Sequence, residues 1–478
     1  MKVAYPMHLI AIAVMALLVR LAMTMIEVPT SGMTSHYLGL SDTMSAGYGY
    51  NRLRGGDTPA FHSSLRAESV RLSLQGQRLS TERRPSLDRS LLTPEFFRTP
   101  GYPLFLYGVY QLLGEPLPAR AQVVQAILGA LLPLLVFGLM AALFDQRPAA
   151  YASAWLTALY PPLAYASVDL LPEGLATLGV LASLLCIVCG RNAGRASLIL
   201  AGGVLLGFTA YLRPNVSLLW TLLGAALFIS MQGWLRPAIA TALLIAGVYG
   251  ALFPWALRNH ELTSKWMWGT TGTGSTLWKA AGEYKNPWGL VRLDDAAYAY
   301  ARAHGFDSDL TPEADAWFMA QMKELLREDP MFFVASTLKR IPWILAPTFD
   351  TGYQNPNRTR GMYSYFLIEE GLSPTEVLRR HPGYVVKAFW ERILVMVTSA
   401  LGSLALVWVA IAHGRRSPGA TALFLAVPTY LIAVHAPTIY QPRYLVPMIP
   451  FQMSAIALLA ASVLSWIRTR RDRRMLPA

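Results

Sequence analysis

The chain of 478 residues is 54% hydrophobic and only 14% charged, with a mean hydropathy of +0.36. Soluble domains carry about a quarter charged residues, so this composition indicates a protein whose solvent is lipid. The net charge of +13 gathers at the ends of apolar segments and in polar loops. That placement fits a membrane protein and gives no reason to expect a nucleic-acid partner.

The first apolar stretch, residues 7–26, imitates a secretory signal peptide because it follows Met1-Lys2. It is too long, it lacks a convincing small-residue cleavage site and many more spans follow, so we interpret it as a retained transmembrane helix. The two cysteines, Cys186 and Cys189, lie inside a later apolar run without a second pair. We favour ordinary helix packing for them over a redox or metal motif.

About ten segments are apolar over the roughly 20 residues that a helix needs to cross the hydrocarbon core. They lie near residues 7–28, 119–144, 149–167, 171–189, 196–212, 215–232, 237–256, 389–412, 419–437 and 445–467. Unpaired backbone is too costly in lipid, and no strand-period alternation indicates a barrel. The sequence therefore predicts an all-α polytopic membrane protein with about ten transmembrane helices.

Basic residues in the short connections predict the orientation, because Lys and Arg favour the cytoplasmic side. The basic connections fall on one common side: 145–147, 191–195, Arg236, 415–416 and the tail 468–474. Both termini are therefore expected in the cytoplasm, and two long loops, 29–118 and 258–388, on the opposite side, where we expect function. The chain then divides into an N-terminal membrane module with the first loop (1–257), a loop domain (258–388) and C-terminal helices with a basic tail (389–478).

The first long loop has an internal organisation of its own. We expect a short helix over residues 42–53, and a Ser- and Arg-rich stretch, 61–89, that is mobile or loosely helical and covers a cavity. Residues 96–113 are aromatic and apolar but are interrupted by two prolines. This pattern predicts an interfacial helix lying along the membrane.

The second long loop contains a clear helix signal. Thr311 as N-cap, followed by Pro312 and Glu313, predicts a helix with apolar spacing as far as Leu326. Residues 331–345 are expected to form a second helix that returns to the membrane.

Acidic groups near membrane depth are costly and often functional, which singles out Asp42, Asp169 and Glu173 on the loop side. Asp42 is placed where it can simply cap the predicted first-loop helix. Glu173 follows Pro172 at the start of the fourth span, where an acid favours a helix N-terminus in any case. Both the functional and the structural interpretation stay open at this point.

Four arginines lie at predicted membrane boundaries on the same side: Arg98, Arg213, Arg258 and Arg443. Arginines there often extend along the apolar surface to place their charge at the interface. A cluster of guanidinium groups at one level also suits a phosphate, through bidentate charge-assisted hydrogen bonds. Arg20, inside the first span, is expected to pair within the protein and has no assigned role.

Several common motifs are absent from the sequence, which has no GxxxxGK[ST] phosphate loop, no HExxH and no His/Cys cluster with metal spacing. The glycine-rich stretch at residues 269–274 is not framed by a strand and a helix, so it is a weak nucleotide signal. No metal and no cofactor are required by any ligand spacing. An enzyme that faces away from the cytosol needs another activated donor, and a lipid-linked one is the obvious choice.

The motifs resemble those of the GT-C membrane glycosyltransferases, in particular the bacterial branch related to dolichyl-phosphate-mannose protein mannosyltransferases and lipid A aminoarabinose transferases. The resemblance runs in order over nearly the whole chain. Its residues are Ser41-Asp42 to Gly56; Arg98-Thr-Pro-Gly-Tyr-Pro-Leu-Phe-Leu106 with Leu113-Gly114; Leu171-Pro-Glu-Gly-Leu175; Leu212-Arg-Pro214; Pro254-Trp-Ala-Leu-Arg-Asn259; and Pro442-Arg-Tyr-Leu-Val-Pro447 with Pro450.

This resemblance implies a polyprenyl-phosphate sugar donor, inversion at the anomeric carbon and an active site between the first loop and the membrane. Carried over by position, Asp42 matches the general base and Glu173 a second acid of the cavity. Arg98, Arg258 and Arg443 match basic positions that hold the donor phosphate. Many relatives have Asp-Glu in the first loop where this chain has Asp42-Thr43, so the resemblance supports a single base and not an acidic pair.

Two alternatives to an enzyme remain on the residues alone. A transporter or flippase for a lipid-linked saccharide would show internal repeats and broken helices, and we find no such repeat. A scaffold would leave the acids and arginines without a purpose. We expect a bacterial cytoplasmic-membrane enzyme that also contacts membrane lipids, with the sugar and the extracytoplasmic acceptor (lipid, glycan or protein) left open.

Overall fold

A computed structural model describes residues 4–25, 33–45, 47–53, 92–114, 117–348, 373–380, 382–383, 386 and 389–475. Across these ranges the regular secondary structure is helical apart from one short β-ribbon. The predictions for residues 61–89 lie outside the described residues.

The elements follow one another in this order. They are α1 (Ala4–Met23), α2 (Met33–Ser45), β1 (Asn51–Leu53), β2 (Leu92–Pro94), α4 (Gly101–Leu113), α5 (Pro118–Gly129), α6 (Leu132–Phe144), α7 (Arg147–Leu159), α8 (Pro161–Ala166), α9 (Glu173–Ala193), α10 (Ala196–Leu212), η3 (Pro214–Leu218), α11 (Trp220–Ser230), α12 (Leu235–Thr263), α13 (Thr273–Ala281), α14 (Asp294–Ala303), α15 (Pro312–Glu328), α16 (Pro330–Leu345), α18 (Pro374–Arg380), η5 (Phe389–Leu394), α20 (Val395–Gly414), α21 (Pro418–His435), η6 (Pro442–Met448) and α22 (Ile449–Met475).

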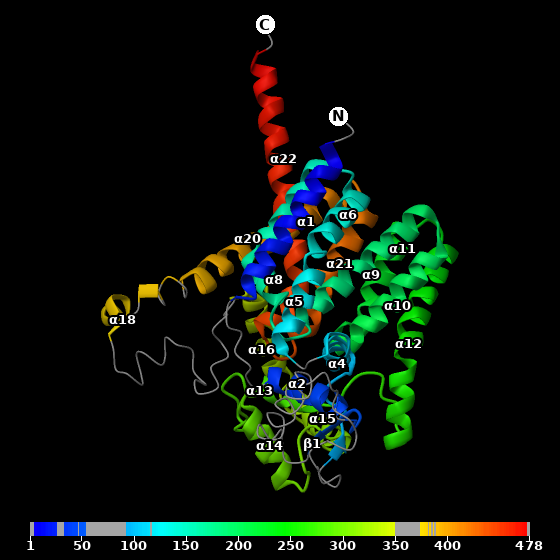
Figure 1. The fold of residues 1–478 in the computed structure, drawn as a ribbon, viewed down its shortest axis with the longest axis vertical. Helices are drawn as coiled ribbons and strands as arrows, with labels where there is room; N and C mark the ends of the chain where they lie inside the picture. Colours follow the sequence, from blue (N-terminus) through cyan, green and yellow to red (C-terminus); the bar gives the residue numbers. More distant parts are fainter. Residues whose placement is uncertain are drawn as a thin grey trace.

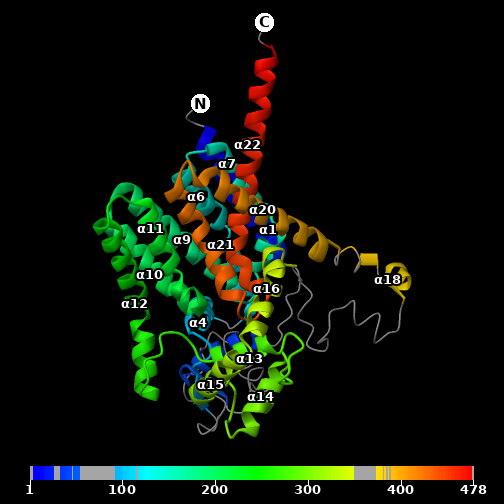
Figure 2. The same cartoon turned by 180° about the vertical axis from the view of Figure 1, so that it is seen from behind.

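The long helices form a bundle with a lobe at one end (Figures 1 and 2). In both views α1 starts and α22 ends at the end of the bundle opposite the lobe. The lobe gathers α2, the β-ribbon and α13 to α15, which come from the two long loops. The loops therefore share one end of the bundle.

Within the part of the chain that the structure describes, six helices are long and apolar enough to cross a membrane by length and composition. They are Pro118–Phe144, Glu173–Ala193, Leu235–Thr263, Val395–Gly414, Pro418–His435 and Pro442–Arg471; the helices at Met7–Met23, Ala196–Leu212 and Pro214–Ser230 are apolar but shorter. Large apolar side chains such as Ile10 on α1 and Leu404 and Ile411 on α20 are exposed, as lipid-facing positions require. The chain is an all-α membrane protein, as predicted, and the count of ten spans stays a prediction.

Several predicted spans have different boundaries in the structure, among them 149–167 and 237–256. The segment 149–167 is divided into α7 and α8 at Tyr160, because Pro161 and Pro162 cannot continue the backbone ladder and start a new helix instead. The segment 237–256 is part of a longer helix, α12, which keeps Pro254 in its interior and ends only at Thr263. The second loop therefore begins later than predicted.

The first-loop helix predicted over residues 42–53 is wrong in its position. The helix, α2, ends at Ser45, and Gly47 follows with a φ of 74°, which a continuing helix cannot accommodate. Residues 51–53 then form β1, which pairs antiparallel with β2 so that Asn51 faces Pro94. Pairing across about forty residues leaves no periodic signal in the sequence, which is why the prediction failed here.

The second-loop helices agree with the sequence. Thr311 Oγ1 accepts a hydrogen bond from the Ala314 amide at the start of α15, and Asp329 Oδ1 accepts one from the Phe332 amide at the start of α16. An aromatic core around Trp278 holds α13 to α16 together, separately from the core of the bundle. The first loop packs on the bundle through a third cluster, in α2, α4 and α5.

Candidate active site

A cavity of about 1010 Å³ lies between the two loops and the adjoining ends of the membrane helices. One wall comes from the first loop, with His36 and Arg52, and the facing wall comes from the second loop, with Lys279 and Asp309. Tyr444, in η6, also lines it. This volume is ample for a small ligand, because ligand sites commonly enclose about 300–1,000 Å³.

Three arginines lie together beside this cavity, and we call Arg98, Arg213 and Arg443 the arginine cluster. Arg98 lies over the ring of Tyr37 at 5.1 Å, and its Nε has no hydrogen-bond partner among the described residues. Arg213 and Arg443 lie over the ring of Tyr444 at 4.7 and 5.1 Å. Aromatic faces hold the guanidinium groups without occupying all their N–H donors.

Glu173 is the carboxylate at the centre of the cluster. It forms an ion pair with Arg213, and its Oε1 lies 3.6 Å from Nε of Arg443. The side chain is 4% exposed, so this carboxylate is held in place by two cations rather than by solvent. Two guanidinium groups beside one such carboxylate, with Arg98 as the third arginine of the cluster, leave excess positive charge at the meeting point of the helix ends.

The local sequence explains why these residues meet. Arg98 precedes α4, Arg213 ends α10, Glu173 begins α9 and Arg443 lies in η6. A side chain on Gly101 would lie 2.5 Å from the Tyr211 carbonyl oxygen, so glycine there lets the start of α4 touch the end of α10.

The glycine of the second motif has the same effect. A side chain on Gly174 would lie 2.3 Å from the Ala166 carbonyl oxygen, so glycine lets the start of α9 touch the end of α8. The acid of the motif, Glu173, is thereby drawn to the level of the arginines. The Arg-Thr-Pro-Gly and Leu-Pro-Glu-Gly motifs thus position their charged residues through a close backbone approach.

Asp169 stands next to the cluster, in the connection between α8 and α9. It contributes with Glu173 and Arg443 to a small cavity of about 20 Å³, room for about one water molecule. Asp169 Oδ1 has no hydrogen-bond partner among the described residues. Burial raises the pKa of this carboxyl to about 6, although Arg443 opposes the rise.

Arg258, predicted to hold the donor phosphate, makes other contacts. Its Nη1 donates to the Glu95 carbonyl at 3.0 Å and to Asn259 Oδ1 at 2.9 Å, and its guanidinium lies 4.7 Å from the Trp255 ring. Arg258 therefore braces β2 and the residues that follow it against α12. The structure brings Arg98 and Arg443 together with Arg213 instead, a boundary arginine that the sequence had singled out without assigning it to the phosphate.

Asp42 lies in the last turn of α2, so it does not cap a helix start as the sequence allowed. It is only 3% exposed. Its neighbour Thr43 donates to the carbonyls of Leu40 and Asn51, which ties α2 to β1. From the same helix, His36 and Leu40 line the large cavity. Asp42 is therefore a buried acid on the helix that lends His36 and Leu40 to the cavity wall, and it is not itself among the lining residues.

Asp309 is an acid in the cavity wall that sequence reasoning missed. It is buried, and burial raises the pKa of its carboxyl, with Lys279 partly offsetting the rise. Lys279 is itself paired with Asp294, Nζ to Oδ1 at 2.8 Å. A lone Asp in a polar loop carries no local signal, and only the packing of α13, α14 and the start of α15 places it here.

The glycine-rich stretch 269–274 connects the loops. The Thr271 amide donates to the Phe96 carbonyl at 3.1 Å, and the Thr271 hydroxyl donates to the Leu310 carbonyl at 2.7 Å. The stretch thus joins the first-loop wall of the cavity to the second-loop wall. It acts as a structural junction, consistent with its weakness as a nucleotide signal.

Other singled-out residues have structural surroundings. Arg20 is buried and donates to Ser167 Oγ and to the Ala158 carbonyl, each at 3.2 Å, so it pairs within the bundle as expected. Cys186 and Cys189 are free, half-buried thiols in α9. Within the described ranges, no three His, Cys, Asp or Glu side chains gather as a metal site.

No family model matches the sequence, and no curated protein matches it either. Among solved structures, the chain is similar to the oligosaccharyltransferase of Archaeoglobus fulgidus in complex with zinc and sulfate. The TM-score is 0.53 at 12% identity, over 97% of this chain and 50% of that one. The archaeal oligosaccharyltransferase AglB with an inhibitory peptide and a dolichol-phosphate matches with a TM-score of 0.53 and 12% identity, over 100% of this chain and 52% of that one.

These neighbours are GT-C glycosyltransferases. The chain has the GT-C fold. It spans about half the length of the neighbouring structures, which are 12% identical to it. The structural similarity is therefore evidence for the fold alone, and the activity is inferred from the residues of the site.

Proposed function

We propose that the chain is an inverting GT-C glycosyltransferase that moves a sugar from a polyprenyl-phosphate donor, such as undecaprenyl phosphate, to an extracytoplasmic acceptor. The observation that carries this proposal is the arginine cluster, three guanidinium groups at the level where membrane helices end and a large cavity begins. A lipid-linked phosphate reaches that level from the bilayer, while an acceptor reaches the cavity from the aqueous side. Guanidinium groups bind phosphate oxygens through paired N–H donors.

In the proposed reaction, an acceptor hydroxyl loses its proton to a carboxylate and its oxygen attacks the anomeric carbon of the sugar. The bond between that carbon and the phosphate oxygen breaks, and the polyprenyl phosphate departs with the electron pair. The arginine cluster stabilises the charge that develops on the departing phosphate, often the larger catalytic term. Glu173 holds Arg213 and Arg443 in position between turnovers.

Asp42 is the proposed general base, and a positioned base contributes about 10²- to 10⁴-fold in rate. Asp309 is the second candidate for this role, because it lines the cavity and carries a raised pKa. Arg258 supports the site in this scheme by bracing the segment that carries Arg98. Metal chemistry is not part of the proposed steps.

The proposed location is the bacterial cytoplasmic membrane, with both termini in the cytoplasm and the cavity outside. The basic connections of the sequence support this orientation. It agrees with the position of the start of α1 and the end of α22 at one end of the bundle, opposite the loops (Figure 1).

Sugar transfer from a panel of radiolabelled undecaprenyl-phosphate sugars by the purified chain tests the proposal. We expect transfer of at least one sugar, a loss of about 10²- to 10⁴-fold in Asp42→Asn and a smaller change in Asp309→Asn. The reverse order of the two variants would move the base to Asp309. If no sugar is consumed but a lipid-linked saccharide crosses liposome membranes, the chain is a flippase and the proposal falls.

A further inference from the structure

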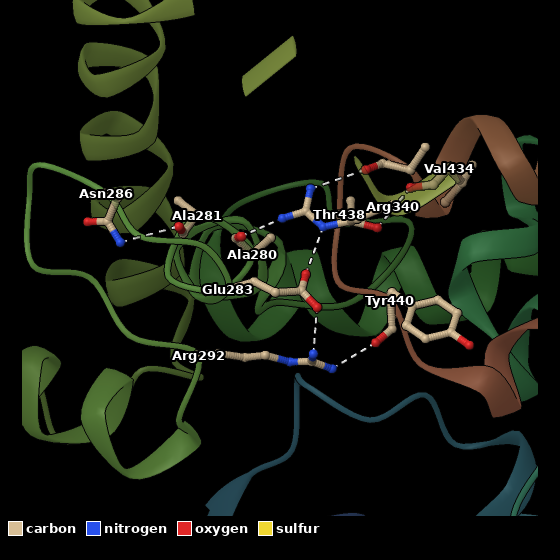
Figure 3. A network of polar contacts seen from close by, with 10 residues as sticks. Ala280, Ala281, Glu283, Asn286, Arg292, Arg340, Val434, Thr438 and Tyr440 are labelled. Atoms are coloured by element: carbon tan, nitrogen blue, oxygen red, sulfur yellow. Dashed lines mark hydrogen bonds and ion pairs between the residues drawn. The ribbon is translucent and has the colours of Figure 1, made fainter. Parts of the chain in front are cut away.

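Glu283, in the turn after α13, binds two arginines from different parts of the second loop (Figure 3). Its Oε2 lies 2.7 Å from Nε of Arg340 on α16, and its Oε1 lies 2.5 Å from Nη1 of Arg292, which precedes α14. The carboxylate side chain is 13% exposed and that of Arg340 is 3% exposed. We call Glu283, Arg292 and Arg340 the latch.

Arg340 connects Glu283 to the C-terminal end of a membrane helix, α21. Its Nη1 donates to the carbonyl of Ala436 at 3.2 Å, and its Nη2 donates to the carbonyl of Ala280 at the end of α13. Ala436 caps the C-terminus of α21, where carbonyls lack partners within the helix and a cation is favourable. The ring of Tyr284 lies 5.2 Å from the guanidinium and covers it.

Arg292 connects Glu283 to the chain that follows α21, close to the start of η6. Its Nη2 donates to the carbonyl of Tyr440 at 2.7 Å. The connection from Ala436 to Gln441 is therefore held at two points by two arginines that share one carboxylate (Figure 3). Because one carboxylate orients both cations, the hydrogen bonds to the Ala436 and Tyr440 carbonyls both depend on Glu283.

This connection leads directly into the site. Ile439 and Gln441 line the large cavity, and η6 begins at the next residue, Pro442. Arg443 follows, 3.6 Å from Glu173, and then Tyr444, whose ring lies against two arginines of the cluster. Only two residues separate the carbonyl held by Arg292 from Arg443, so a shift of one is transmitted to the other.

We propose that Glu283 is a positioning residue for the donor-phosphate site. It fixes the connection between α21 and η6 through Arg340 and Arg292, and thereby fixes Arg443 and Tyr444. The inference rests on the proposed function for its kinetic consequence, while its structural consequence can be measured without any substrate. It also means that docking of the second-loop helices on the bundle and binding of the donor phosphate are coupled.

The test uses the full-length chain in lipid nanodiscs with Glu283→Gln, which keeps the size but removes the charge and one of the two acceptor oxygens, and Glu283→Asp, which keeps the charge. Hydrogen–deuterium exchange of peptides covering residues 436–448 is the substrate-free readout. Donor KM, acceptor KM and kcat are measured on the same preparations. Glu324→Gln is the matched control, because it breaks a carboxylate–arginine pair on the exposed face of α15.

We expect Glu283→Gln to speed exchange in residues 436–448 by about ten- to a hundredfold and to raise the donor KM by about tenfold, since one charge-assisted contact controls both. The acceptor KM should stay within about twofold, Glu283→Asp should recover part of the loss, and Glu324→Gln should change neither readout. Unchanged exchange in residues 436–448, or equal acceleration throughout the chain, would overturn the proposal. If the parent chain transfers no sugar while the local exchange response is present, the latch stands and the proposed function fails.

Discussion

The arginine cluster and the latch contain the same chemical unit, a carboxylate between two guanidinium groups. In the cluster, Glu173 pairs with Arg213 and lies 3.6 Å from Arg443. In the latch, Glu283 pairs with Arg292 and Arg340. Both carboxylates are largely buried, so burial and composition alone do not tell a ligand site from a structural contact.

The difference lies in what the remaining N–H donors contact. In the latch they donate to the backbone carbonyls of Ala280, Ala436 and Tyr440, so the cations join the end of α13 to the connection between α21 and η6. In the cluster the guanidinium groups lie mainly over aromatic faces, a third arginine joins them, and a large cavity adjoins. Backbone acceptors make such a unit a brace, whereas rings and an adjoining cavity make it a candidate site for an anion.

The largest effect on stability is expected from Arg340→Ala. It leaves the carbonyl of Ala436 without this donor and removes one of the two cations on Glu283, which for a buried pair costs about 3–5 kcal/mol of unfolding free energy. Chemical or thermal unfolding in detergent measures the loss. Lys339→Ala, an exposed neighbour, is the control and should cost under about 1 kcal/mol. Equal losses would show that the latch is not a brace.

The cluster should respond in activity as well as in stability, because Glu173 is also a buried carboxylate between two cations. Arg213→Gln is expected to lower kcat/KM for the donor by about 10²- to 10³-fold, or about 3–4 kcal/mol, because a preorganised donor to the leaving phosphate is lost. Arg236→Gln, an exposed arginine at the start of α12, is the charge-matched control and should leave kcat/KM unchanged. Full activity in Arg213→Gln would remove the cluster from the reaction and break the comparison with the latch.

The sequence predicts much of the bundle and of the cluster for one physical reason. A lipid bilayer requires long apolar helices, and a charged side chain costs least free energy near a helix end. The charged residues Arg98, Glu173, Arg213 and Arg443 are therefore easy to recognise at the boundaries of apolar runs. Pro and Gly beside them mark the helix starts. These are local signals, and they are readable without knowing which helices touch.

The features that the sequence did not predict depend on long-range contacts. Arg340 and Glu283 are 57 residues apart, and Arg292 donates a hydrogen bond to a carbonyl 148 residues away. No local sequence pattern therefore predicts the latch. The pairing of β1 with β2 and the position of Asp309 in the cavity wall have the same origin. Arg258 also depends on a long-range contact, because it donates to the Glu95 carbonyl 163 residues away, and its assignment to the donor phosphate stays a prediction.

Asp169, next to the arginine cluster, is expected to make the stability of the folded chain depend on pH. Its pKa is raised from the ordinary value to about 6 by burial, so the folded chain holds a proton that the unfolded chain releases near pH 4. This contribution to stability is complete below about pH 4 and is lost as the pH rises through about 6, by up to about 3 kcal/mol. Thermal unfolding from pH 4.5 to 7.5 should show Asp169→Asn gaining on the parent as the pH rises. Parallel curves for the parent and Asp169→Asn would contradict this assignment.

The smallest effect is expected where the same pair of residue types meets at the surface. Arg327 lies 2.9 Å from Glu324 on α15, with both side chains about 70% exposed. Water screens such a pair and two long side chains must be ordered to form it, so Arg327→Ala should change the unfolding free energy by less than about 1 kcal/mol. Its donor KM should equal that of the parent, measured beside Arg340→Ala and Arg213→Gln. If Arg327→Ala lowered the unfolding free energy as much as Arg340→Ala, the second-loop helices would be sensitive to the loss of any charge. The position of the latch at the end of α21 would then not explain its effect on stability.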